Sequence, residues 1–142
     1  MHKFERKDSW ILLSVAQARH DGPPKLDNVI WVADGINKDI PTREEIEGAI
    51  NRLLSAGLVR VAGYYFFVTE LGSNILEQAR SGAKSIFDVW NMLEKRLGTT
   101  EFPEVPHAPW HLSESDFERA YESYRSNFAK TFKKLDDKDE LT

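Results

Sequence analysis

The stretch from Pro41 to Gly72, PTREEIEGAINRLLSAGLVRVAGYYFFVTELG, constrains the fold of this chain most strongly. Thr42 stands before a run of helix-forming residues and Glu45 follows three positions later, which is the pattern of a helix capping box. Apolar residues then recur at the 3.6-residue spacing of one helix face: Ile46, Ile50, Leu53 and Leu54. Gly57 follows where a helix favours a left-handed residue at its end. The stretch therefore begins with a helix.

A β-hairpin is predicted directly after this helix. Residues 58–61 and 64–69 are rich in β-branched and aromatic side chains, and Ala62 with Gly63 supplies a turn between them. The stretch therefore reads helix, tight connection, hairpin and the start of another helix.

The two faces of the predicted hairpin are expected to have different neighbours. If Phe66 and Val68 point inward, alternation along the strand places Tyr65 and Phe67 on the opposite face. Other helices of the chain can cover these two aromatic residues, or the residues form a patch that binds a partner. We therefore treat Tyr65 and Phe67 as candidate partner-binding residues.

The order of helix and hairpin resembles the recognition helix and wing of the winged helix-turn-helix superfamily. The segment RLLSAGLV, followed by an aromatic strand that ends in VTELG, carries this resemblance. The GLV…VTELG pattern is similar to bacterial regulators of the MarR and PadR type. The resemblance implies a winged-helix domain over residues 8–80 and, as in many such regulators, a dimer formed through the terminal helices.

Apolar periodicity and capping residues predict five further helices. The first covers residues 8–20, with Asp8 or Ser9 as its cap, and the second follows Asp27. The others cover residues 69–80, residues 83–97 and a long helix that starts at Ser113 or Ser115. The predicted fold class is mainly α with a small β-hairpin (α+β), a winged helix-turn-helix with additional C-terminal helices.

A proline-rich strap, residues 98–112, precedes the last helix. Its three prolines oppose regular helix, and Phe102 and Trp110 are expected to anchor it across the domain surface. Residues 81–135 are thus predicted to form a helical extension packed on the same domain. Residues 136–142 are predicted to be a flexible polar tail.

Charge bears directly on whether the predicted recognition helix reads DNA. The formal net charge is −4, and no segment concentrates the basic residues that typify a nucleic-acid binder. The winged-helix register implies a sparse set of DNA contacts: Thr42, Arg43, Asn51, Arg52 and Arg60. Three glutamates share the first turns of this helix and would lose their hydration beside a polyanion: Glu44, Glu45 and Glu47. An exposed, solvated helix face explains them more simply.

The last helix carries an aromatic stripe at three- and four-residue steps: Phe117, Tyr121, Tyr124 and Phe128. We expect this stripe to pack against the helix over residues 83–97, where Trp90 and Leu93 offer a matching surface, or against another chain. Two-fold pairing is the commonest form of homo-oligomer, and aromatic residues are enriched at interface centres. The stripe therefore predicts a homodimer.

Catalysis and metal binding have little support in the sequence. The chain has no cysteine, no glycine-rich phosphate loop and no nucleophile elbow. His107 and His111 have the spacing of metal ligands on a helix, but Pro106 and Pro109 oppose a helix there. We therefore expect no enzyme activity, cofactor or metal. The absence of a long apolar run or signal peptide predicts a cytoplasmic protein without membrane association.

Two functions remain open. The first is a non-catalytic winged-helix protein that acts as a protein-interaction and self-association module through a partner not identified by the sequence. The second is a dimeric DNA-binding transcriptional regulator of the winged-helix type. The acidic recognition helix favours the first function and the superfamily resemblance favours the second. We place the interaction module first.

Overall fold

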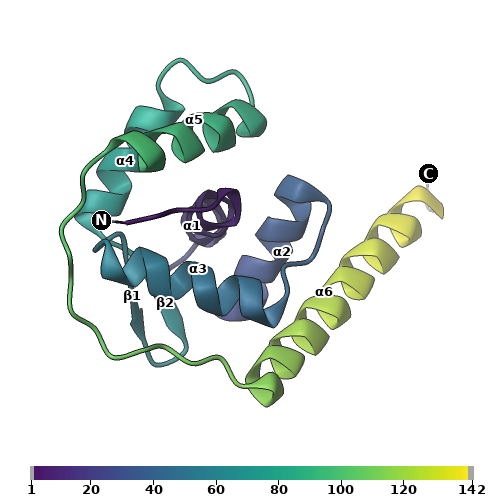
Figure 1. Ribbon diagram of the computed structural model, residues 1–142. Coiled ribbons are helices and arrows are strands. Elements are labelled where there is room, and N and C mark those ends of the chain that lie inside the picture. Colours follow the sequence, from purple (N-terminus) through teal and green to yellow (C-terminus); the bar gives the residue numbers. More distant parts are fainter. Residues whose placement is uncertain (1, 141–142) are drawn as a thin grey trace.

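The computed structural model describes the backbone of residues 2–140 and the side chains up to Thr131, together with Lys133. The described chain is mainly helical with a small antiparallel hairpin, an α+β arrangement (Figure 1). In chain order the elements are α1 (Arg6–Ala18), α2 (Leu26–Asn37), α3 (Arg43–Ser55), β1 (Val59–Ala62), β2 (Tyr65–Val68), α4 (Glu70–Arg80), α5 (Ile86–Thr99) and α6 (Glu114–Glu140).

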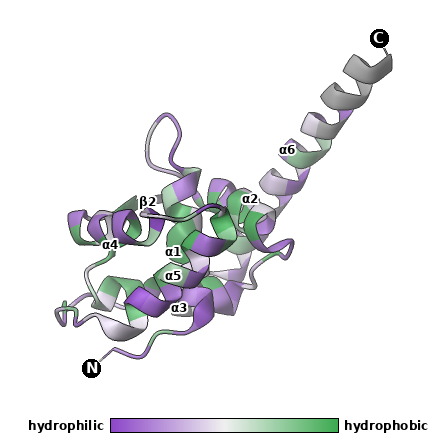
Figure 2. Cartoon of the chain, turned by 90° about the horizontal axis from the view of Figure 1, so that it is seen from above, coloured by the Kyte–Doolittle hydropathy of each residue, from purple (hydrophilic) through white to green (hydrophobic). Residues whose placement is uncertain are grey.

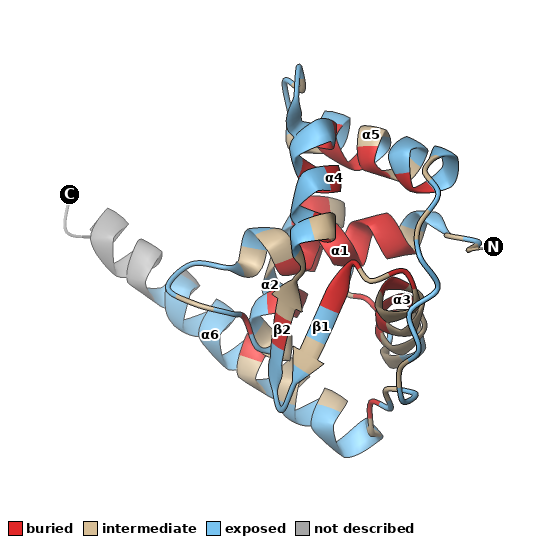
Figure 3. Ribbon diagram, turned by 90° about the vertical axis from the view of Figure 1, so that its left-hand side faces the viewer, coloured by how far each residue is buried: buried red, intermediate tan, exposed pale blue. Residues whose placement is uncertain are grey.

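Helix α1 forms the centre of the core, because α2, α3, α5 and the hairpin all contact it. Its buried residues include both apolar and small polar side chains, and Figure 3 shows most of this helix in the colour of buried residues. The Trp10 indole N–H donates to the Ala33 carbonyl at 3.0 Å, and that of Trp90 donates to Ser9 Oγ at 3.0 Å. These bonds satisfy polar groups inside the core and link α1 to α2 and α5.

Helix α3 has the capping box that its sequence predicts. The Glu45 amide donates to Thr42 Oγ1 at 3.1 Å, and the Thr42 amide donates to Glu45 Oε1 at 3.0 Å. Its inward face is apolar and buried: Ile46, Ala49, Ile50 and Leu53. Gly57 follows the helix with a φ of 72°, as predicted for a left-handed position.

The hairpin pairs Val59 with Val68 and Ala62 with Tyr65, so its two-residue turn is Gly63–Tyr64. The predicted turn was one residue too early. Gly63 takes a φ of 60°, and glycine at the first turn position suits a tight hairpin.

The alternation predicted along β2 is confirmed in part. Phe66 is buried, Val68 is partly buried against the core, and Tyr65 is 41% exposed on the other face. The backbone before α2 adds a further pairing to the hairpin, since the Phe66 amide donates to the Pro24 carbonyl at 3.0 Å and Lys25 bridges to Tyr65.

Several predicted helix starts were wrong. Helix α1 begins at Arg6 because the Asp8 carboxylate accepts the Glu5 amide at 2.8 Å, so Asp8 lies inside the first turn. Lys25, rather than Asp27, precedes α2, and α5 begins at Ile86, three residues after the predicted start, with Ser85 as its cap.

Helix α6 starts at the first of its two predicted caps and runs further than predicted. Ser113 Oγ accepts the Asp116 amide at 3.1 Å. The helix continues to Glu140, whereas a flexible tail was predicted from Asp136. Residues 141 and 142 of that predicted tail lie outside the described residues.

Of the two partners predicted for α6, helix α5 was wrong, and the other alternative, a second chain, stays a prediction. Trp90 and Leu93 are buried with α1, so the apolar face of α5 is already covered. Helix α6 instead crosses α2 and then runs away from the rest of the molecule (Figure 1). Tyr124 is buried at this crossing and its hydroxyl donates to the Asp34 carboxylate. Burial, with the Asp34 contact adding to it, raises the pKa of Tyr124 to about 12.

Candidate functional site

The outward face of α3 is the candidate site, because the predicted DNA contacts lie on or beside this helix. This face is polar, and Figure 2 shows much of α3 as hydrophilic while α1 is mostly hydrophobic. The strap descends beside the helix, and its extended part begins after α5 ends at Thr99 (Figure 3). The strap therefore lies beside the helix that carries most of the predicted DNA contacts.

Asn51 binds the main chain of the strap in both directions. Its Nδ2 donates to the Trp110 carbonyl at 2.7 Å, and its Oδ1 accepts the Trp110 amide at 2.8 Å. The same Nδ2 also donates to the Glu47 carbonyl at 2.9 Å within the helix. Three hydrogen bonds thus fix the side-chain amide, and Asn51 contacts the strap rather than solvent.

Glu47 and Arg43 hold the next contact, at Leu112. Glu47 Oε2 accepts the Leu112 amide at 2.8 Å, and Arg43 Nη1 donates to the Leu112 carbonyl at 2.8 Å and to Glu47 Oε2 at 2.9 Å. Leu112 itself is only 3% exposed. Both polar groups of one strap residue are therefore bound by side chains one helical turn apart.

The charge of Glu47 is stabilised by this contact. The hydrogen bond from the Leu112 amide lowers the pKa of Glu47 below its usual value, and the neighbouring Arg43 and His111 side chains act in the same direction. His111 Nδ1 lies 3.0 Å from Glu47 Oε2. The glutamate that disfavours DNA binding in the sequence thus has a structural use in the folded chain.

The strap also contacts the end of α3. The Val105 amide donates to the Ser55 carbonyl at 2.8 Å, and Ser55 Oγ lies 2.8 Å from His107 Nε2. Gly57 leaves room for Val105, since a Cβ on Gly57 would stand 3.1 Å from a Val105 methyl group. The strap thus follows α3 from its C-terminal end toward its N-terminal end.

Arg52 points toward α1 instead of toward a ligand. Its Nε donates to Asp8 Oδ2 at 2.8 Å and its Nη2 donates to Asp8 Oδ1 at 2.8 Å, while Glu5 lies 3.2 Å away. Burial raises the pKa of Asp8, although the hydrogen bonds from Arg52 and from the Glu5 amide oppose this. Because Asp8 is fully buried, its charge depends on Arg52 for compensation.

The remaining predicted DNA contacts do not join a common surface. Thr42 uses its hydroxyl as the cap of α3, and Arg60 lies on β1 with its guanidinium 5.7 Å from the Phe67 ring centroid. The structure therefore gathers Arg43 and Asn51 under the strap, directs Arg52 to the core and leaves Arg60 on the hairpin.

The predicted partner-binding residues also fall into separate places. Tyr65 and Phe67 belong to the hairpin, and the other four belong to α6: Phe117, Tyr121, Tyr124 and Phe128. The α6 rings follow one another along the helix with centroids 6.0–6.3 Å apart; the first pair is stacked and the next two are tilted. Trp31 of α2 adds to this row, and its centroid lies 5.7 Å from that of Phe128. Sequence reasoning missed Trp31 because it lies beside the predicted apolar stripe of its helix.

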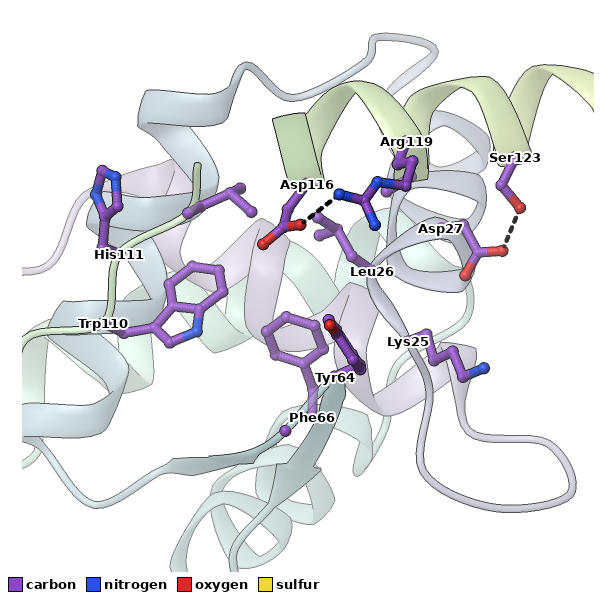
Figure 4. Close-up of a pocket in the computed structure, with 13 residues that line it drawn as sticks. Lys25, Leu26, Asp27, Tyr64, Phe66, Trp110, His111, Asp116, Arg119 and Ser123 are labelled. Carbon is purple, nitrogen blue, oxygen red and sulfur yellow. Dashed lines mark hydrogen bonds and ion pairs between the residues drawn. The ribbon is translucent and has the colours of Figure 1, made fainter. Parts of the chain in front are cut away.

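A cavity of about 550 Å³ lies where the hairpin, the start of α2, the strap and the start of α6 meet (Figure 4). Phe66 and Trp110 form part of its wall, with their rings packed edge to face at 5.7 Å. Its charged lining is mixed: Lys25, Asp27, Asp116 and Arg119, the last two paired at 3.5 Å. Because the lining carries both positive and negative side chains, the cavity favours neither an anionic nor a cationic ligand.

The described part of the chain contains neither a cluster of metal ligands nor a helix that could span a membrane. No three histidine, aspartate or glutamate side chains there are grouped to hold a metal ion, and His107 and His111 contact Ser55 and Glu47 instead. None of the described helices combines the length and the apolar character needed to span a bilayer.

Comparison with known proteins adds no assignment. No family model matches the chain, and neither the curated proteins nor the solved structures contain a significant match. The functional argument therefore rests on the residues and contacts described above.

Proposed function

We propose that this chain is a non-catalytic winged-helix protein that works through protein contacts, including self-association. The observation that carries the proposal is the strap on α3. Asn51, Glu47 and Arg43 occupy the face that a DNA-reading winged helix would present, and all three bind the main chain of Trp110 or Leu112.

The winged-helix part of the proposal is supported by the order of elements. Three helices precede a two-stranded hairpin, a fourth helix follows it, and the chain before α2 pairs with β2. Strand β1 contacts α3, and the Leu58 amide just before it donates to the Leu53 carbonyl of α3 at 3.0 Å. Many functions share such a fold, so the site must decide between them.

The electrostatics of α3 favour protein contacts over DNA. Glu44 is 72% exposed at the side chain, and the two arginines of α3, Arg43 and Arg52, already pair with carboxylates. A DNA-binding surface gains affinity by neutralising phosphates with uncommitted basic side chains. The second candidate, a dimeric DNA-binding regulator, is favoured by Arg60, which stays exposed on the hairpin.

Self-association is supported by an aromatic pair at the crossing of α2 and α6. Trp31 is 37% exposed and Phe128 is 40% exposed, and their rings contact each other. Aromatic residues that stay partly exposed in one copy are typical anchors of an interface. A two-fold pairing would bury this pair against its equivalent in a second copy.

The test combines DNA binding with sedimentation of the full chain. We expect no binding to random duplex DNA at physiological salt by fluorescence anisotropy, and a dimer at micromolar concentration. Phe128→Glu should shift the chain to monomer, whereas Phe87→Glu, at an exposed ring on α5, should leave the dimer intact. Tyr124 is unsuitable for this test because its hydroxyl also hydrogen-bonds to Asp34 and so links α6 to α2 within one chain.

Two results would overturn the proposal. Micromolar or tighter binding to duplex DNA would favour the DNA-binding regulator. Sedimentation of the wild type as a monomer throughout the micromolar range would remove self-association and leave the aromatic row as packing within one chain.

A further inference from the structure

The strap is bound on α3 as an extended peptide ligand is bound by a receptor. Main-chain groups of three strap residues are recognised: Val105 by the Ser55 carbonyl, Trp110 by Asn51, and Leu112 by Glu47 and Arg43. Hydrogen bonds to the main chain do not depend on which side chain the bound residue carries. The same helix face can therefore hold a segment with another sequence.

Two side chains of the strap supply the selective contacts. Trp110 packs against Phe66 and Leu112 is buried, while the His111 side chain between them is 75% exposed. An extended segment directs alternate side chains to opposite sides, so residues two positions apart both reach the protein. The site thus fits an aromatic residue followed, two positions later, by an aliphatic one.

The strap buries fewer of its side chains than the helices do. From Thr100 to Leu112, only Leu112 is buried, and the three prolines donate no main-chain hydrogen bond. A segment with few buried apolar contacts opens at a lower free-energy cost than the core does. The α3 face can therefore be vacated while the packing of α1, α2 and α3 persists.

Charge gives the site a direction. At the end where the strap arrives, His2 Nε2 lies 2.8 Å from the Pro103 carbonyl oxygen and 3.3 Å from a Glu104 carboxylate oxygen. Lys3 lines the same shallow hollow. This basic edge favours an acidic residue on the N-terminal side of the aromatic anchor.

We propose that the outward face of α3 is a peptide-binding site, occupied here by the chain's own strap. Its partner is an extended, proline-containing segment of another protein, with an acidic residue preceding an aromatic-x-aliphatic pair. The inference rests on the proposed function, because it requires a protein that works through protein contacts. A second copy is the poorer occupant, because its strap has the same sequence as the tethered strap, which already stands at an effective concentration of about millimolar.

The test separates the receptor from its built-in ligand within the full chain. The receptor is the Trp110→Ala, Leu112→Ala variant, whose strap lacks both anchors. The probe is a fluorescein-labelled peptide with the sequence of residues 100–113, TEFPEVPHAPWHLS, followed by fluorescence anisotropy. We expect saturable binding to this variant, and at least tenfold weaker binding to the wild type, whose site is filled.

Two matched controls define the contacts. A peptide with alanine in place of Trp110 and Leu112 should bind the receptor at least tenfold more weakly. Adding Asn51→Leu to the receptor should weaken binding of the unaltered peptide at least tenfold. Leucine has a similar size to asparagine, but its side chain cannot hydrogen-bond to the Trp110 main chain. Equal binding in either control would overturn the proposal.

Folding and the identity of the occupant are checked separately. If the double variant loses its cooperative melt, Trp110→Ala alone, which keeps the buried Leu112, serves as the receptor. Displacing half of the labelled peptide should require at least tenfold more unlabelled wild-type chain than unlabelled peptide. Equal competition would overturn the proposed partner in favour of strap exchange between copies.

The result is independent of the test of the proposed function. Loss of peptide binding with the dimer retained would overturn only the peptide site. A monomeric chain that still binds the peptide would overturn self-association and leave the peptide site in place.

Discussion

The two faces of α3 are stabilised in different ways. The inward face buries Ile46, Ile50 and Leu53 in the common core. The outward face carries Glu47 and Asn51, which hydrogen-bond to a segment that lies 59 or more residues further along the chain. One face is defined by local apolar periodicity, whereas the other is defined by a distant partner. A polar helix face therefore cannot be assigned to solvent, DNA or protein until its neighbour is known.

The largest effect is expected on the inward face, at Leu53. This side chain is fully buried, so Leu53→Ala should lower the free energy of unfolding by about 2–5 kcal/mol. Leu54→Ala, on a partly buried neighbour, is the matched control and should cost less. Denaturant unfolding measures both. An unchanged midpoint for Leu53→Ala would contradict the assignment of the inward face.

An intermediate effect is expected at Arg52, where α3 meets α1. Arg52→Met leaves the buried Asp8 carboxylate without its guanidinium partner and should cost about 1–3 kcal/mol. Without that partner the pKa of Asp8 rises further, so the folded state binds more protons than the unfolded state as Asp8 titrates. The stability loss should therefore shrink as the pH is lowered.

The matched control for Arg52 is Arg80→Met. Arg80 lies on the surface of α4 and contacts Gln17 and Glu77, so its loss should change stability by only a few tenths of a kcal/mol. Equal losses for Arg52→Met and Arg80→Met would show that the Asp8 pair contributes nothing beyond an exposed contact.

The parts of the fold that were predictable from sequence are local ones. The Thr42–Glu45 box, the left-handed Gly57 and the buried Phe66 each follow from residues a few positions apart. The one-residue error in the hairpin turn arose because Gly63 occupies the first turn position instead of the second. Local chemistry decides whether such an element forms, and its boundaries shift with the tertiary contacts.

The position of α6 and the contents of the candidate site were less predictable. The aromatic stripe of α6 was recognised, but α5 or another chain was expected to pack against it, because the burial of Trp90 against α1 depends on long-range packing. Asp34 accepts a hydrogen bond from the Tyr124 hydroxyl, and no sequence pattern predicts this contact. Likewise, Asn51 was assigned to DNA by resemblance, and only the placement of the strap reveals its bond to Trp110.

The smallest effect is expected on the outward face, in its response to pH. Because the pKa of Glu47 is lowered from its reference value of 4.5 in the folded chain, the unfolded chain takes up a proton first as the pH falls. The contribution of Glu47 is therefore fully present above pH 4.5 and is lost as the pH falls through the lower, folded value. Arg43 and His111 face Glu47, and Glu44 shares Arg43 with it.

Nuclear magnetic resonance can follow this titration at the Leu112 amide, which donates to Glu47. In the wild type its chemical shift should change with a midpoint below pH 4.5, and Glu47→Gln should abolish that change while keeping an oxygen acceptor. Glu44→Gln, beside the same arginine, should leave the midpoint of the Leu112 amide almost unchanged. A wild-type midpoint at or above 4.5 would mean that Glu47 gains nothing from the strap, and the outward face of α3 would then be open in solution.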